Sequence, residues 1–227
     1  MIFNFEGQRI LFIEPPKNAT TSVRQWFMEH GEVDEVLDKK LERHYAFADI
    51  LNVLRDAQFD FMFSIIRHPL DRLVSEYKYM EKLALSPSDA VKHDLHTKAS
   101  QKLIYDAPDL NYFIKDYFHT SKFPMPYLEQ KKQSKMLMGR DGLSIPSKIH
   151  LLHFENLADD FNDMLTKILD EKTKVKYGDV KLPHYNPTER TKDWRGYYND
   201  DSLQKALKFY EKDMQEFGYE IYRDICH

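Results

Sequence analysis

Three short apolar runs mark the chain, and each is followed by a segment whose apolar residues recur at helical spacing. The runs cover residues 10–13, 59–66 and 149–154. Each is too short for a stable helix and is rich in residues that favour strands, so we expect a buried strand at each position. Because these strands alternate with helices, the pattern predicts an α/β fold around a central parallel sheet.

Signals at the expected helix starts support this division. Hydroxyl side chains at residues 20–22 are suited to cap a helix after the first strand, and Asn18 is the residue best able to take a left-handed turn before them. Pro69 stands at the expected first position of the second helix. An amphipathic stripe follows the third strand, and residues 200–217 form a final helix. Residues 44–48 suit either a short strand or a helix start.

The composition is that of an ordinary globular protein of one domain. With 227 residues, 42% of them hydrophobic, the chain can bury a substantial core. A net charge of −4 argues against nucleic-acid binding through overall charge. The single cysteine, Cys226, excludes an internal disulfide and a cysteine-based metal site. No apolar run approaches membrane-spanning length, so we expect a cytoplasmic protein without a membrane segment.

Two strand ends carry cationic side chains that suit a ligand with two anionic groups. Lys17 follows the first strand, and the backbone N–H groups of the next helix start complete an anion cradle, although the glycine-rich Walker sequence is absent. Arg67 leaves the second strand and can bind a phosphate through two parallel hydrogen bonds. Ser75 offers a hydroxyl about two turns further on. The alternatives are a solvated lysine, an ion-paired arginine and an ordinary helix serine.

Longer motifs run through the same regions. Residues 16–22, Pro-Lys-Asn-Ala-Thr-Thr-Ser, resemble the 5′-phosphosulfate loop of the sulfotransferases, written P-K-x-[AG]-x-T-S. Residues 63–77 resemble the 3′-phosphate motif of that family, F-x-x-[VI]-R-x-P-x-x-R-x-x-S-x-[YF]. Residues 153–157 match a further motif of that family, F/Y-E-[ND]-L, and residues 182–186, 194–198 and 210–219 resemble the C-terminal signature of its carbohydrate-type members. The matches keep the family order, and only residues 80–145 are largely unmatched. The chain is therefore similar to a sulfotransferase of the carbohydrate superfamily.

This resemblance implies a fold, a donor and a reaction. The fold would be a P-loop-NTPase-like three-layer domain over residues 1–227, with a central parallel sheet and a largely helical insertion at about 80–145 that shapes the acceptor cleft. The donor would be 3′-phosphoadenosine 5′-phosphosulfate (PAPS), leaving 3′-phosphoadenosine 5′-phosphate (PAP) as product. The sulfuryl group would pass by in-line displacement to a hydroxyl of a carbohydrate or small molecule. No metal is required.

The resemblance also assigns residues to roles. The expected donor-binding residues are Lys17, Asn18, Ala19, Thr20, Thr21, Ser22, Arg67, Ser75, Arg190 and Lys192. Lys17 would in addition be catalytic, because it can hold the charge that grows on the leaving phosphate. His44 is the first candidate for the base that deprotonates the acceptor, in competition with the other histidines of the chain. Glu14 departs from the family pattern, since many relatives have a histidine three places before the lysine. A carboxylate so close to the donor sulfate would repel it unless it faced the acceptor, so Glu14 is a second candidate base or an acceptor-orienting group.

Two other functions stay open on the sequence. A P-loop-like small-molecule kinase would depend on ATP and Mg²⁺, but it would need the glycine-rich Walker motif, which this loop lacks. A non-catalytic nucleotide- or glycan-binding relative would bind PAP without turnover.

Overall fold

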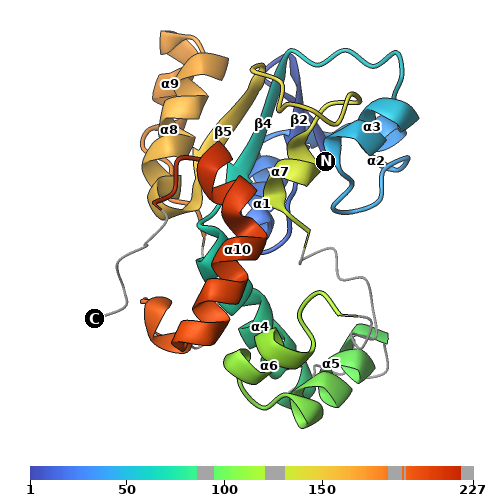
Figure 1. Ribbon diagram of the computed structural model, residues 1–227. Coiled ribbons are helices and arrows are strands. Elements are labelled where there is room, and N and C mark those ends of the chain that lie inside the picture. The colour runs from blue at the N-terminus through green and yellow to red at the C-terminus, as the bar shows by residue number, and fades with distance from the viewer. Residues whose placement is uncertain (86–94, 121–130, 184–190, 192, 221–227) are drawn as a thin grey trace. The chain divides into compact units, whose positions relative to one another are not determined.

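The computed structural model (Figure 1) describes five stretches of the chain, which are residues 1–85, 95–120, 131–183, 191 and 193–220. The chain divides into two compact units. Unit 1 comprises residues 1–67 and 132–185, and unit 2 comprises residues 68–131 and 186–227. Each unit has a hydrophobic core of its own. Among the described residues, no helix has the length and apolar character needed to cross a membrane.

Unit 1 is built on a five-stranded sheet of order β3-β1-β2-β4-β5. Its strands are β1 (Ile2–Phe5), β2 (Gln8–Ile13), β3 (Glu32–Val33), β4 (Phe61–Ile66) and β5 (Ile149–His153). β2, β4 and β5 are parallel neighbours, whereas β1 is antiparallel to both β2 and β3. The three strands predicted from the apolar runs are the three parallel ones, and the predicted α/β fold with a central, mostly parallel sheet is confirmed.

The sequence analysis missed the hairpin of β1 and β2. Its two-residue turn holds Glu6 at φ 46° and Gly7 at φ 78°. Positive φ at both central residues is typical of the type I′ turn, whose twist matches that of the strands it joins. The glycine at position 7, placed between two apolar runs, was the signal that could have found this hairpin.

Two helices cover one face of the sheet in unit 1. These are α1 (Thr20–His30) and α8 (Leu157–Ile168), whose buried residues share one core with strand residues such as Phe12 and Phe63. The rings of Phe12 and Phe63 stack at a centroid distance of 4.5 Å across β2 and β4. Since residues 10–13 are all fully buried, both faces of β2 are covered, as expected for a parallel strand inside a sheet.

The other helical elements of unit 1 are short. They are α2 (Glu35–Asp38), α3 (Phe47–Val53), α7 (Gln133–Leu137), α9 (Glu171–Tyr177) and a 3-10 turn (Phe154–Asn156). The open choice at residues 44–48 is decided in favour of a helix start, because α3 begins at Phe47. α7 belongs to unit 1 even though it lies in the segment that the family motifs left unmatched.

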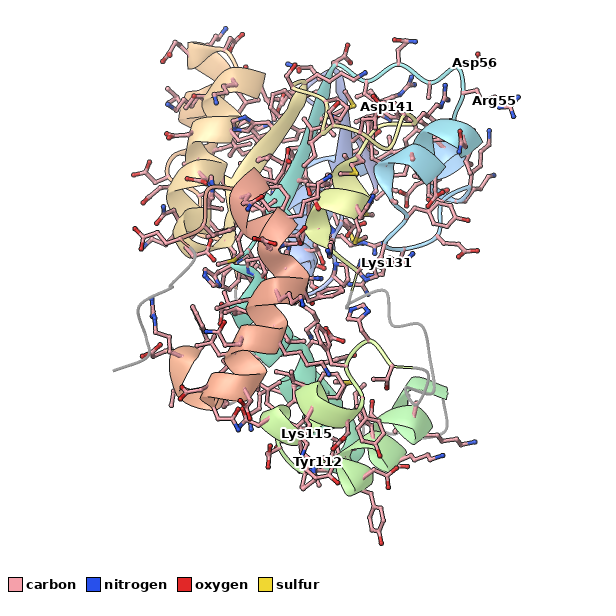
Figure 2. The ribbon with its side chains drawn as sticks, viewed as in Figure 1. Arg55, Asp56, Tyr112, Lys115, Lys131 and Asp141 are labelled. Atoms are coloured by element: carbon pink, nitrogen blue, oxygen red, sulfur yellow. The ribbon has the colours of Figure 1, made fainter. Side chains whose placement is uncertain are left out.

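Unit 2 is helical in its described part. Its elements are α4 (Pro69–Leu85), α5 (Leu95–Asp106), α6 (Leu110–Asp116), a 3-10 turn (Arg195–Tyr197) and α10 (Asp200–Glu216). Pro69 is the first residue of α4, as predicted. On α6, Phe113 and Ile114 are buried, while Tyr112 and Lys115, labelled in Figure 2, lie on its exposed side. The helix is therefore amphipathic, with its apolar side in the core of this unit.

Candidate active site

The loop between β2 and α1 holds two non-glycine residues in left-handed backbone, Lys17 at φ 69° and Ala19 at φ 56°. The prediction that Asn18 takes this conformation is wrong. The side chain of Asn18 is fully buried, and its Nδ2 donates a hydrogen bond of 2.6 Å to the Ile65 carbonyl, so the turns fall on its two neighbours. Left-handed backbone costs an L-residue about 1–2 kcal/mol. Such strain is concentrated at functional sites.

The start of α1 carries no cap from a side chain. Ala19 is the N-cap residue, and residues 20–22 lie within the first turn of the helix, so the expectation that their hydroxyls cap it is wrong. The first turn also lacks an acidic residue. The positive end of the helix dipole is therefore left without a carboxylate from the helix itself. A helix start of this kind, preceded by a lysine loop, is suited to bind an anion.

A second cation lies at this helix start. Arg43 donates from Nη2 to the Thr21 hydroxyl over 3.3 Å. A guanidinium at the positive end of a helix dipole is unfavourable by itself, and a bound anion would offset that cost. The sequence analysis did not find Arg43, because no local pattern links it to the first turn of α1.

Arg67 comes directly after β4 and meets the lysine loop. Its side chain is 3% exposed, and Nη1 donates to the Lys17 carbonyl over 2.7 Å. The guanidinium also lies 3.9 Å from the ring centroid of Phe154, which follows the end of β5. These contacts hold the guanidinium beside the loop, at the edge of the sheet where the parallel strands end. Open α/β sheets bind their ligands at this edge.

His44 reaches the same loop from a distant part of the chain. Its Nδ1 lies 2.7 Å from the carbonyl oxygen of Glu14. Since a carbonyl only accepts hydrogen bonds, Nδ1 carries the proton, and the lone pair of the neutral ring is at Nε2. This tautomer has the acceptor nitrogen that a general base requires.

The Glu14 carboxylate is 5% exposed and lies within reach of an ammonium group. Its Oε2 is 3.4 Å from the amino nitrogen of Met1, which also donates to the Phe12 carbonyl. A positive partner reduces the repulsion that a carboxylate would exert on an anion in the loop. The expected role of Glu14 as an acceptor-facing base stays a prediction.

The end of β5 carries a histidine–carboxylate pair that the sequence analysis passed over. His153 is in register with Ile66, the residue before Arg67. Its Nδ1 is 3.2 Å from Asp160 Oδ2, and its backbone N–H donates to the same oxygen over 2.6 Å. The Asp160 carboxylate therefore orients the imidazole of His153 at the edge of the sheet that Arg67 occupies.

The remaining predicted site residues fall elsewhere. Ser75 lies in α4 of unit 2 and is 8% exposed. Arg190 and Lys192 lie outside the described residues. In unit 1 the structure brings together Lys17, Asn18, Arg67, His44 and Glu14, through the hydrogen bonds given above.

Comparison with known proteins adds the family. No match to the chain was found among curated proteins or among solved structures. The model of a family described as the sulfotransferase family matches residues 4–220. This match covers nearly the whole chain, including the lysine loop, His44 and Arg67. The chain therefore belongs to the sulfotransferase family.

Proposed function

We propose that this sulfotransferase takes PAPS as its donor and transfers the sulfuryl group to a hydroxyl of a carbohydrate or small-molecule acceptor. One observation carries the proposal. The Arg67 guanidinium is hydrogen-bonded to the Lys17 carbonyl at 2.7 Å, so two cationic residues belong to one cluster at the ligand-binding edge of the sheet. PAPS is a nucleotide with anionic groups at its 5′ and 3′ positions, and a pair of cations matches that charge pattern.

The residues present fit such a donor. Lys17 and the backbone N–H groups at the start of α1 would hold the 5′-phosphosulfate, since the helix has neither a side-chain cap nor a first-turn carboxylate of its own. Arg43 would add a second positive charge at that end. Arg67 would hold the 3′-phosphate, and its stacking on Phe154 supports this role because it restricts the guanidinium before the ligand arrives.

The remaining donor contacts are proposed from the family motifs. Ser75 would add a hydroxyl to the 3′-phosphate, and Arg190 or Lys192 would contact a phosphate. Residues 80–145 would carry the determinants of acceptor choice, within a single functional domain of residues 1–227.

The chemical step needs a proton acceptor and a group that stabilises the leaving phosphate. His44 Nε2 would take the proton of the acceptor hydroxyl, while the Nδ1–H bond to the Glu14 carbonyl keeps the ring in the required tautomer. Lys17 would hold the negative charge that develops on the departing phosphate. The donor, when bound, supplies the sulfuryl group and this leaving group.

The donor is tested by a thermal-shift comparison. We expect PAP to raise the melting temperature of the protein, and ATP with Mg²⁺ to raise it far less, because ATP lacks a 3′-phosphate for Arg67. A larger shift with ATP and Mg²⁺ would favour the kinase alternative. A shift with PAP in a protein that sulfates none of a panel of hydroxyl acceptors would favour the non-catalytic alternative.

A further inference from the structure

The backbone N–H and C=O of Arg67, just beyond the end of β4, are hydrogen-bonded to a side chain and not to a neighbouring strand. The ladder between β4 and β5 stops at the pair Ile66 and His153, so the peptide groups of Arg67 lie beyond it. The side-chain amide of Gln133 takes the place of a neighbouring strand there. Its Oε1 accepts from the Arg67 N–H over 3.0 Å, and its Nε2 donates to the Arg67 carbonyl over 2.7 Å. Buried peptide groups need such partners, and one amide satisfies both.

The same amide also binds the lysine loop. Gln133 Oε1 accepts a second hydrogen bond, of 2.6 Å, from Asn18 Nδ2. The other hydrogen of that Nδ2 is donated to the Ile65 carbonyl. Both side chains are fully buried. The neighbours fix the orientation of both amides, because Asn18 Nδ2 faces two acceptors and Gln133 Oε1 faces two donors.

These bonds close a ring. Asn18 is covalently linked to Lys17, it donates to Gln133, Gln133 binds both peptide groups of Arg67, and Arg67 Nη1 donates back to the Lys17 carbonyl. The ring therefore joins the two residues to which we assign the two ends of the donor. It also explains how Lys17 and Ala19 keep left-handed backbone on either side of Asn18, whose side chain is anchored on two buried acceptors.

Gln133 stands where the chain returns to unit 1. The first segment of unit 2 ends at Lys131, an exposed residue labelled in Figure 2, and Arg67 is the last residue of unit 1 before the chain first leaves it. One side chain of unit 1 thus joins the residue at which the chain first leaves this unit to the segment by which it returns. Removing one member of such a buried network leaves its partners unsatisfied, which is costly in a low-dielectric interior, so the arrangement is expected to be lost.

We propose that Gln133 is a positioning residue that sets the spacing between the Lys17 loop and Arg67, and thereby selects nucleotides with anionic groups at both the 5′ and 3′ positions. This inference rests on the proposed function. The selectivity arises because a ligand held at one end tolerates a displaced loop, whereas a ligand held at both ends requires the two groups to be correctly separated. In enzyme active sites, a misplacement of about 1 Å can lower the reaction rate roughly 100-fold.

The first test measures binding of PAP and AMP to the full chain by calorimetry. Gln133→Met keeps a side chain of similar length and removes the amide. We expect it to weaken binding of PAP by about 10- to 100-fold, the range for losing one hydrogen bond to a charged group, and binding of AMP by much less. The matched control is Met136→Ala, which removes buried packing from the same helix, α7, and leaves the ring of hydrogen bonds intact. This control should leave the ratio of PAP affinity to AMP affinity unchanged.

A second variant and a second readout separate the possible failures. Gln133→Asn keeps a neutral amide that is one methylene shorter and cannot reach both peptide groups of Arg67, so it tests the idea if the methionine variant does not fold. Backbone hydrogen exchange of residues 17–22, which follow two prolines without an N–H, should quicken without ligand in either Gln133 variant and stay unchanged in Met136→Ala. A wild-type protein that binds no PAP would refute the donor assignment, while the exchange rates would still report on the coupling. Equal losses of PAP and AMP, or unchanged exchange, would overturn the role of Gln133.

Discussion

The replacement Arg67→Lys tests whether the Arg67 guanidinium binds the 3′-phosphate, because it keeps the positive charge at this position. Lysine keeps the positive charge but lacks the planar fork of the guanidinium and its stacking on an aromatic ring. In the structure the fork donates to the Lys17 carbonyl at 2.7 Å, and the guanidinium lies 3.9 Å from the Phe154 ring centroid. A hydrogen bond to a charged group contributes about 1.5–3 kcal/mol. Loss of one such bond to the 3′-phosphate corresponds to a fall in PAP affinity of roughly 10- to 150-fold.

The assay is titration calorimetry with PAP and with AMP on the folded variant. AMP has no 3′-phosphate, so we expect its affinity to fall by less than about threefold. This small loss would come from a slight displacement of the Lys17 loop. Arg140→Lys is the matched control, because this arginine lies in unit 1 with an exposed side chain and is assigned no ligand. Equal losses for PAP and AMP, or wild-type affinity for PAP, would show that Arg67 does not read the 3′-phosphate.

Three further outcomes are expected. Lys17→Ala should lower kcat by about 10²- to 10³-fold with an unchanged unfolding curve, and wild-type turnover would rule out Lys17 as the group that stabilises the leaving phosphate. His44→Ala should lower kcat by about 10²- to 10⁴-fold and leave PAP binding intact. If His153→Ala shows this loss and His44→Ala does not, the general base is His153 at the end of β5 and not His44. Burial and the neighbouring Lys167 lower the pKa of His150 in the folded protein below its usual 6.5. As the pH falls through 6.5, the unfolded chain therefore binds a proton at His150 more readily than the folded protein does, and the free energy of unfolding decreases. Urea unfolding at a series of pH values should show that His150→Gln loses less stability at acidic pH than the wild-type protein, and an identical pH dependence would contradict this account.

The sequence by itself determined the parts of the molecule that local chemistry controls. The three parallel strands follow from short apolar runs, because a strand buried on both faces needs a continuous apolar segment. The start of α4 follows from Pro69, whose fixed φ suits the first position of a helix and whose missing N–H would be unpaired there in any case. The positions of Lys17 and Arg67 at strand ends follow from the same runs.

Only the tertiary structure decided how these parts are used. Asn18 has the local propensity for left-handed backbone, yet its side chain is anchored on Ile65 and on Gln133, 115 residues away, and the left-handed turns pass to Lys17 and Ala19. Gln133 has no local signal, because its partners are peptide groups and an amide from distant segments. Contacts of this kind depend on which buried polar atoms the fold brings together, and the periodicity of apolar residues along the chain does not predict these pairs.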